Sequence, residues 1–321
     1  VFGDWSSDVC SSDLTIYIGG VSVILHIFDA EKTLDAIERY KVTSFGQIPS
    51  LFNMQWRLEN YSRYNLLSLK FALYGGQAVS KEFLEKLSNM APKFGTGLGL
   101  TETAGFVTYT PLDGTVDDIV SSVGFDMPLC PISIRDPMKA DGSAGDPKGK
   151  NEVGEICFSG QQVFLGYLGD MENTRKTLST DGYVYTGDLG FYDEKGLHFS
   201  GRSKFVIKPK GYQIFPAEVE SFIEEALPDK VEMAGCIGVK HEIYSEAIVL
   251  FVEKKVGVEL SAKEVMDAAK GMAAYKRPAH VVILNPEEMP LNRVQKTDYM
   301  VLKKMADKAI EKLKVAGKWD K

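Results

Sequence analysis

The sequence has little cysteine and no long apolar run, and each absence excludes a class of protein. Its four cysteines, Cys10, Cys130, Cys157 and Cys236, lie far apart and form no Cys-x-x-Cys pair. This spacing argues against a disulfide framework and a structural zinc site, and it fits a reducing compartment. No apolar run reaches the ~20 residues that a membrane-spanning helix needs. We therefore expect a cytoplasmic protein without a transmembrane segment.

The sequence also has fewer basic than acidic residues. The 37 lysines and arginines are outnumbered by 44 aspartates and glutamates, which gives a formal net charge of −7. Because no basic excess is present to displace counterions from a phosphate backbone, we expect no nucleic-acid partner. The 321 residues, of which 44% are hydrophobic, are typical of a globular protein. They leave room for roughly two domains.

The N-terminal stretch differs from the rest of the chain. Val1–Leu14 carries Ser-Ser-Asp twice and has neither hydrophobic periodicity nor the basic start of a signal peptide. We expect a disordered or foreign extension here. The apolar stretch Val21–Phe28 is expected to form a buried strand or the start of a helix.

The hydrophobic pattern predicts an α/β layer, then a small β unit, then an α+β module. The first layer is expected to contain a helix over Glu31–Tyr40, strands over Val42–Phe45 and Leu69–Tyr74, a helix capped by Ser80, and a strand around Lys93-Phe94. The β unit is expected to be mostly antiparallel, with short segments over Gly124–Arg135, Glu155–Ser159, Tyr183–Tyr185 and Leu197–Ser200.

The last module is predicted from residue 203 onward. It is expected to contain a helix starting at Pro216, strands over Met233–Val239 and Ala247–Val252, a helix with a Ser261/Glu264 capping box, a strand over Val281–Leu284, and a helix over Asp298–Val315.

Two charged motifs suggest a nucleotide site. Thr186-Gly187-Asp188 places an acid on what is expected to be a tight turn, and Asp188 can accept two hydrogen bonds from a vicinal diol such as ribose. Arg202, in the basic segment that follows, offers a planar fork of donors to a hydroxyl or a phosphate. No Walker loop accompanies them.

A glycine-rich stretch over residues 95–103 is the second candidate. Its glycines would let the backbone approach an anion, Thr101 offers a hydroxyl, and Glu102 offers a hard oxygen to Mg²⁺. A plain turn after a strand explains the same glycines. A Rossmann loop is a further alternative, although the spacing here is Gly-x-Gly-x-Gly.

The sequence carries five short motifs. They are residues 74–80 (Tyr-Gly-Gly-Gln-Ala-Val-Ser), residues 98–102 (Leu-Gly-Leu-Thr-Glu), Gly154-Glu155-Ile156 with Gly166-Tyr167 and Thr174, residues 181–188 (Asp-Gly-Tyr-Val-Tyr-Thr-Gly-Asp), and residues 201–220. Together they resemble, in the same order, the motifs of the adenylate-forming superfamily, which includes AMP-forming acyl-CoA synthetases, luciferases and peptide-synthetase adenylation domains. The resemblance runs from about Thr15 to the end of the chain. It implies part of a large adenylation domain over residues 15–202 and a small, mobile C-terminal domain over residues 203–321.

The resemblance implies an enzyme that binds ATP, forms AMP, and uses Mg²⁺ and coenzyme A. Asp188 would bind the ribose with help from Arg202, Thr101 would touch the α-phosphate, and Glu102 would hold Mg²⁺. The implied adenine-side residues are Gly76, Gln77, Ala78 and Leu98.

The same resemblance implies two half-reactions separated by rotation of the small domain. Lys296 would stabilise the charge that develops as a carboxylic acid is adenylated. Lys208 would enter the site for the thiol-transfer step, where Gly211 leaves room for the thiol's arm. Lys204 occupies the hinge position.

The chain also departs from the family's pattern. Leu98 stands where an aromatic residue usually stacks on adenine, and residues 293–295 (Arg-Val-Gln) replace a Ser-Gly before the lysine. The family's Ser/Thr/Gly-rich phosphate loop is absent. We therefore expect a fragment of an acyl-CoA synthetase that starts inside the large domain.

Two other functions stay open. One is an adenylation module that loads a carrier-protein thiol, although no carrier motif follows Lys296. The other is a non-catalytic remnant that still binds a nucleotide. Phe52, Met54, Tyr74 and Phe106 suggest an apolar acyl or aryl substrate, or equally a hydrophobic core.

Overall fold

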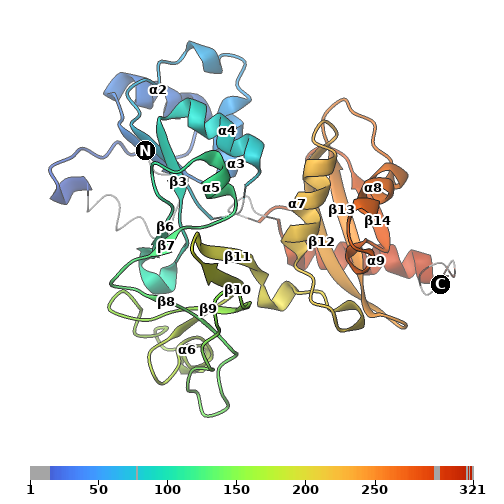
Figure 1. Ribbon diagram of the computed structural model, residues 1–321. Coiled ribbons are helices and arrows are strands. Elements are labelled where there is room, and N and C mark those ends of the chain that lie inside the picture. Colours follow the sequence, from blue (N-terminus) through green and yellow to red (C-terminus); the bar gives the residue numbers. More distant parts are fainter. Residues whose placement is uncertain (1–14, 77–78, 293–296, 316, 318, 320–321) are drawn as a thin grey trace. The chain divides into compact units, whose positions relative to one another are not determined.

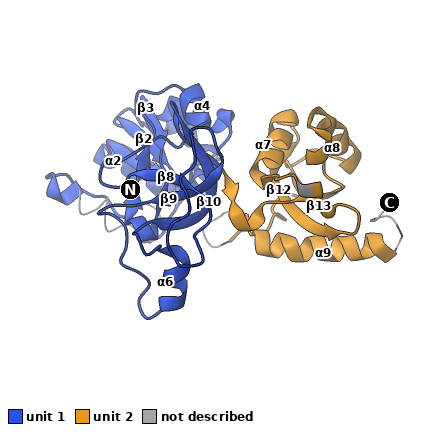
Figure 2. Ribbon diagram, turned by 60° about the horizontal axis from the view of Figure 1, so that its bottom comes forward, with its two compact units in different colours: residues 1–199 blue, residues 200–321 orange. Residues whose placement is uncertain are grey.

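The chain folds as two compact units (Figure 2). In the computed structural model, which describes residues 15–76, 79–292, 297–315, 317 and 319, unit 1 extends to Phe199 and unit 2 begins at Ser200. Each cluster of buried apolar side chains among these described residues lies wholly within one unit. Each unit therefore has its own hydrophobic core.

Unit 1 opens with a three-stranded parallel sheet, in which β1 (Ser44–Gln47) pairs with β2 (Phe71–Tyr74) and β2 pairs with β3 (Lys93–Thr96). Strand β3 is labelled in Figure 1. Asp29 caps the helix before β1, and Ser80 caps the helix before β3 by accepting a 3.3 Å hydrogen bond from the Phe83 amide. The predicted α/β layer is thus confirmed. Its strands are β1 (Ser44–Gln47), β2 (Phe71–Tyr74) and β3 (Lys93–Thr96), and its helices are α2 (Ala30–Tyr40), α3 (Pro49–Trp56) and α4 (Lys81–Met90).

The core of this layer is aromatic. Phe52 on α3 is fully buried, and its ring meets Phe45 edge-on at 5.4 Å and Phe83 at 5.8 Å. The Tyr74 ring packs against Phe83 at 5.5 Å and is 4% exposed. Phe52 and Tyr74 therefore belong to the core, as one of the two sequence hypotheses had it, while Met54 is exposed.

The remainder of unit 1 is built mainly from short antiparallel strands, as predicted. Two small antiparallel pairs, β4 with β5 and β6 with β7, precede a four-stranded sheet in the order β11-β10-β9-β8. The elements are β4 (Gly99–Leu100), β5 (Gly105–Phe106), β6 (Thr108–Tyr109), α5 (Val116–Val120), β7 (Phe125–Asp126), β8 (Ile132–Arg135), β9 (Gly154–Phe158), α6 (Met171–Thr177), β10 (Val184–Asp193) and β11 (Gly196–Arg202).

Unit 2 is a three-stranded sheet with helices against it, which confirms the predicted α+β module. The sheet order is β12-β13-β14, with β12 and β13 antiparallel and β13 and β14 parallel. Helix α7 lies along β12 (Figure 2). The elements are α7 (Pro216–Ala226), β12 (Val231–His241), β13 (Ser245–Lys254), α8 (Ala262–Ala268), β14 (His280–Leu284) and α9 (Tyr299–Val315).

Short 3-10 turns connect many of these elements. They are η1 (Tyr61–Arg63), η2 (Thr101–Thr103), η3 (Ser203–Phe205), η4 (Pro209–Gly211), η5 (Ala269–Gly271) and η6 (Ala274–Lys276).

Two sequence expectations need correction. The stretch 21–28 forms neither a strand nor a helix: Val21, Ile24 and Ile27 are exposed, and only Val23 and Leu25 pack against the core. The first strand runs over Ser44–Gln47 rather than Val42–Phe45, because its register follows its pairing with β2.

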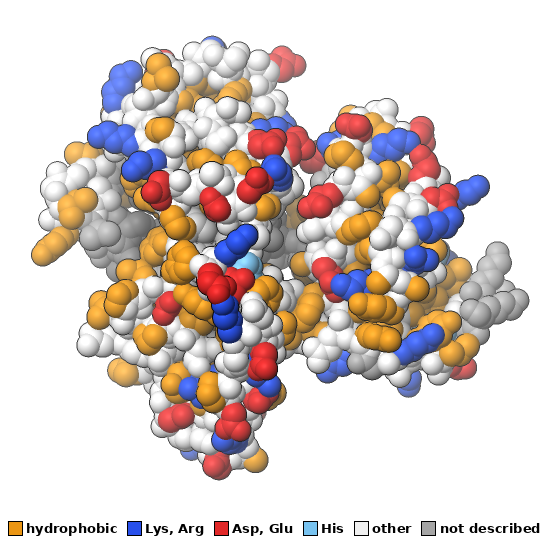
Figure 3. All heavy atoms as spheres, viewed as in Figure 1, with side chains coloured by type: hydrophobic (Ala, Val, Ile, Leu, Met, Phe, Trp, Pro, Cys, Tyr) orange, Lys and Arg blue, Asp and Glu red, His pale blue; other side chains and the backbone are white. Residues whose placement is uncertain are grey.

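The three cysteines that the structure describes, Cys130, Cys157 and Cys236, are free and buried. Within the described ranges, no helix is long and apolar enough to cross a membrane. On the face shown in Figure 3, acidic and basic side chains are interspersed.

Candidate functional site

The carboxyl edge of the parallel sheet brings two of the predicted segments together. Tyr74 pairs with Thr96 at the ends of β2 and β3, and the Thr96 hydroxyl donates a 2.8 Å hydrogen bond to the Tyr74 carbonyl. The chain therefore leaves these two strands side by side, towards Gly76 from one and towards Leu98 from the other. Ligands of α/β sheets commonly bind at this edge. The predicted contacts Gln77 and Ala78 lie outside the described residues.

The glycines after β3 are explained by packing within the fold. A Cβ on Gly97 would lie 2.1 Å from the Thr108 carbonyl oxygen, and one on Gly99 would lie 2.4 Å from the Gly105 carbonyl oxygen. Close approach of neighbouring backbone therefore accounts for both glycines. The Rossmann alternative is wrong, because β3 leads into β4 and the three-residue turn η2 rather than into a helix.

Thr101 and Glu102 stand on η2, directly after β4. Thr101 is exposed, so its hydroxyl is open to a ligand. Glu102 is half-buried, and its Oε1 accepts a 2.5 Å hydrogen bond from the Tyr167 hydroxyl. This bond raises the pKa of the Tyr167 phenol. Glu102 is thus held in one orientation by a residue 65 positions later in the chain.

Sequence reasoning assigned no role to Tyr167. Its backbone amide donates a 2.9 Å hydrogen bond to the Thr174 hydroxyl, which itself donates to the Asp170 carbonyl at 2.7 Å. A Cβ on Gly166 would lie 2.8 Å from the Thr174 methyl carbon. The motif Gly166-Tyr167 with Thr174 was therefore the available sequence signal, although the bond to Glu102 is visible only in the structure.

Asp188 lies within a strand, which corrects the predicted tight turn. β10 continues through Thr186-Gly187-Asp188, but its pairing with β9 shifts register between Tyr185 and Leu189. Gly187 has a φ of +72°, the left-handed region that favours glycine. Such a bulge re-aims side chains, and bulges are common beside active sites.

The bulge brings a second carboxylate near Asp188. Glu155 on β9 accepts a 2.9 Å hydrogen bond from the Gly187 amide, and the Thr186 hydroxyl accepts a 3.0 Å bond from the Asp188 amide. Partial burial raises the pKa of Glu155, and the charge of Asp188 raises it further, whereas the Gly187 amide opposes the shift. The Asp188 residue is 2% exposed.

Four of the predicted residues, Arg202, Lys204, Lys208 and Gly211, lie on the N-terminal segment of unit 2. Arg202 is the exposed last residue of β11, and the Lys204 ammonium sits 4.9 Å from the Phe205 ring centroid. Lys208 is exposed, and its backbone amide donates to Glu246 Oε2 at 2.6 Å. Gly211 is the last residue of η4. Lys296, the predicted catalytic lysine, lies outside the described residues.

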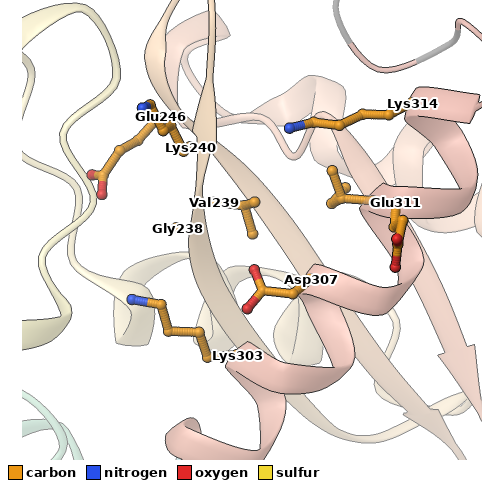
Figure 4. Close-up of a pocket in the computed structure, with 9 residues that line it drawn as sticks. Gly238, Val239, Lys240, Glu246, Lys303, Asp307, Glu311 and Lys314 are labelled. Atoms are coloured by element: carbon orange, nitrogen blue, oxygen red, sulfur yellow. The ribbon is translucent and has the colours of Figure 1, made fainter.

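A hollow of about 440 Å³ between β12 and α9 contains none of the predicted site residues (Figure 4). Positively charged lysines and negatively charged carboxylates line it, among them Lys303 and Asp307 on α9 and Lys240 on β12. In the part of the chain that the structure describes, no group of three or more His, Cys, Asp or Glu could hold a metal ion. Glu102 therefore stands as a single carboxylate.

The chain matches two related protein families. Residues 9–168 match the AMP-binding enzyme family, and residues 210–296 match the AMP-binding enzyme C-terminal domain. A luciferin 4-monooxygenase of Nipponoluciola cruciata is 30% identical over 91% of this chain and 52% of its own length. A 4-coumarate–CoA ligase of Humulus lupulus is 31% identical over 86% and 50%. The chain thus spans about half the length of these relatives.

Solved structures agree with the fold. ATP-bound MatB of Rhodopseudomonas palustris is 26% identical, covers 92% of this chain and 56% of its own, and superposes with a TM-score of 0.78. The amide bond synthetase McbA of Marinactinospora thermotolerans, at 24% identity, shares the fold with a TM-score of 0.82 over 92% of this chain and 58% of its own. Together with the two family matches, which cover most of the sequence, these similarities show that the chain belongs to the adenylate-forming superfamily.

Proposed function

We propose that this chain carries the chemistry of an AMP-forming acid–thiol ligase. In the first half-reaction, a carboxylate oxygen attacks the α-phosphorus of ATP, the bond from that phosphorus to the bridging oxygen breaks, and pyrophosphate leaves. In the second, the sulfur of coenzyme A loses its proton and attacks the acyl carbon, and AMP leaves with the bonding electrons of the broken carbon–oxygen bond.

The observation that carries this proposal is the pair of loops leaving β2 and β3. Gly76 and the Leu98–Glu102 segment emerge from adjacent strands whose ends are in register. The segment at Gly76 offers its backbone to the adenine base. The Leu98–Glu102 segment offers the Thr101 hydroxyl and the Glu102 carboxylate to the phosphates. The 4-coumarate–CoA ligase relatives and the ATP complex of MatB support this assignment.

We assign the nucleotide contacts as follows. The exposed Thr101 hydroxyl touches the α-phosphate. Glu102, oriented by Tyr167, would offer one hard oxygen to Mg²⁺, and the bound ion would neutralise part of the phosphate charge. Asp188 binds the ribose hydroxyls with help from Arg202. The adenine contacts are Gly76, Gln77, Ala78 and Leu98.

The cationic residues divide between the two half-reactions. Lys296 neutralises charge between the carboxylate and the phosphate in the first, which is the preorganised electrostatic role typical of enzymes. Lys208 and Gly211 serve the thiol-transfer step. Lys204, at the boundary of the two units, is the hinge about which the small domain changes orientation.

The substrate is a small-molecule carboxylic acid, and the relatives do not restrict it to fatty acids. We favour coenzyme A over a carrier-protein thiol because 4-coumarate–CoA ligases recur among the relatives.

Pyrophosphate exchange into ATP, measured with a panel of aryl and alkyl acids, tests the first half-reaction. We expect acid-dependent exchange, and we expect Lys296→Ala to lower its rate by about 100-fold or more. Equal rates in the parent and Lys296→Ala would remove Lys296 from this step. AMP binding without any exchange would instead favour the non-catalytic remnant.

Thioester formation from preformed acyl-AMP tests the second half-reaction. Coenzyme A and a carrier-protein phosphopantetheine thiol are offered separately. Reaction with coenzyme A supports the proposal, and reaction with the carrier protein alone would replace it with the carrier-loading function.

A further inference from the structure

Two glutamates on α7 face β12 and accept hydrogen bonds from its backbone. Glu220 Oε1 accepts from the Cys236 amide at 2.7 Å, and Glu224 Oε1 accepts from the Ala234 amide at 2.8 Å. Removal of each carboxyl group from water raises its pKa, to about 8 for Glu220 and about 7 for Glu224. A carboxylate is costly to withdraw from water, so each buried carboxyl group depends on its hydrogen-bond partners.

Glu220 makes a further contact that Glu224 lacks. The Tyr299 hydroxyl lies 2.9 Å from both oxygens of the Glu220 carboxylate. The Tyr299 ring also stacks on the Phe205 ring, with centroids 4.7 Å apart and planes 28° apart. Phe205 is the last residue of η3, the turn that contains Lys204. Tyr299, at the start of α9, therefore contacts both Glu220 on α7 and this turn.

The chain on the N-terminal side of Tyr299 is anchored as well. The Asp298 amide donates to the Pro290 carbonyl at 2.7 Å, and Leu291 forms a bridge with Thr297. The Met289 amide donates at 2.7 Å to Glu253, which is 6% exposed. Backbone pairing thus joins Pro290 and Leu291 to Thr297 and Asp298, on the two sides of residues 293–296, which lie outside the described residues.

We propose that Tyr299 and Glu220 are positioning residues that fix the chain immediately after Lys296 against α7 and, through Phe205, against the hinge segment. The inference rests on the proposed function, since it takes Lys296 as the group to be positioned. Thr297, one residue after Lys296, begins the anchored chain. A displacement of about 1 Å in a catalytic group can cost about 100-fold in rate, so such an anchor has a measurable effect.

A matched pair of variants isolates the contact. Glu220→Ala and Glu224→Ala change the same residue type on the same helix, and each removes one acceptor for a β12 amide, but only the first removes the partner of Tyr299. Tyr299→Phe is the smaller change, because it removes the hydroxyl and keeps the ring. Glu220→Gln retains an acceptor oxygen and serves as the conservative rescue.

The first readout is pyrophosphate exchange at saturating ATP. We expect Tyr299→Phe and Glu220→Ala to lower kcat by about 10-fold or more, with the KM for ATP within about twofold. Glu220→Gln should retain most of the rate, and Glu224→Ala should stay within about twofold of the parent. Equal losses in Glu220→Ala and Glu224→Ala, with Tyr299→Phe unchanged, would overturn the proposal.

The second readout does not depend on activity. Hydrogen exchange in peptides covering residues 289–299 should be about 10-fold faster in Tyr299→Phe than in the parent and unchanged in Glu224→Ala. If the parent shows no pyrophosphate exchange, the proposed function fails, and hydrogen exchange alone still tests the anchor. Unchanged protection in Tyr299→Phe would overturn it.

Discussion

At the scale of single residues, side-chain hydroxyls and glycines fix the chain around Thr101. The Leu98 amide donates a 2.8 Å hydrogen bond to the Thr108 hydroxyl, which in turn donates to the Val123 carbonyl at 2.6 Å. Gly97 and Gly99 allow the close backbone approach that these bonds require. The candidate site therefore rests on a tightly packed support, and its glycines are structural.

Substitution of Gly99 tests this explanation. In Gly99→Ala, the new methyl group would lie 2.4 Å from a backbone oxygen that cannot move freely. We expect a loss of about 1–3 kcal/mol in the free energy of unfolding, as is typical of overpacking. The measurement is urea denaturation of the full chain.

Gly149→Ala is the matched control, because its nearest neighbour is a side-chain atom of Glu152 at 3.5 Å. We expect it to change stability by less than about 0.5 kcal/mol. Equal effects of the two substitutions would refute the packing explanation.

At the scale of elements, helix α7 packs against strand β12 in unit 2. Val219 and Ile223 on α7 are buried, and Glu220 and Glu224 bond the backbone of β12 beside them. Polar and apolar contacts therefore alternate along one face of a single helix. This arrangement makes the stability of the pair sensitive to proton concentration.

The sign of that sensitivity follows from the raised pKa values of the two glutamates. An unfolded glutamate has a pKa near 4.5, whereas Glu220 and Glu224 have values of about 8 and about 7 in the folded chain. The folded state thus binds more protons between these limits. The stabilisation is complete below about pH 4.5 and is lost as the pH rises through 7 and 8.

We therefore predict that the double variant Glu220→Gln/Glu224→Gln gains stability relative to the parent as the pH rises from 5 to 8.5, by about 1 kcal/mol or more. Urea midpoints at several pH values measure the difference. Two curves that stay parallel over this range would contradict the prediction.

Most elements could be predicted because their signals are local. The Ser261/Glu264 capping box and Pro216 at a helix start are read directly from neighbouring residues, and both are confirmed. Helix α3 was not predicted, because its apolar residues show little helical periodicity. Its Phe52 is buried by contacts with Phe45 and Phe83 on other elements.

The candidate site was less predictable, because its contacts span long sequence separations. The bond from Tyr167 to Glu102 joins residues 65 positions apart, and the one from Tyr299 to Glu220 joins residues 79 apart. The bulge at Asp188 arises from pairing with β9, which no local pattern encodes. Motif resemblance located Glu102, Tyr167, Asp188 and Glu220, but it did not locate Tyr299 or indicate the bonds to Glu102 and Glu220.

At the scale of the whole molecule, the chain consists of two units with separate cores. The buried clusters of unit 2 contain residues such as Ile223, Leu250 and Leu302, and no buried residue from unit 1. A core that is complete within one segment is the usual condition for independent folding.

We predict that residues 200–321 expressed alone fold cooperatively. Circular dichroism during urea titration should give a single sigmoidal transition, with a slope of roughly 1–3 kcal/mol per molar urea. The same segment carrying Val249→Asp, a charge at a fully buried position, is the control that should lack a transition. A gradual, featureless titration of the unmodified segment would show that unit 2 depends on the rest of the chain.

Glu220 and Glu224 on α7 also limit which backbone amides of β12 are available for pairing with another strand. β12 is the outermost strand of its sheet, and an outermost strand with vacant amides is a template for strands of other molecules. The amides of Ala234 and Cys236 are already taken by Glu224 and Glu220. These two hydrogen bonds leave that part of β12 less available to pair with a strand of another molecule.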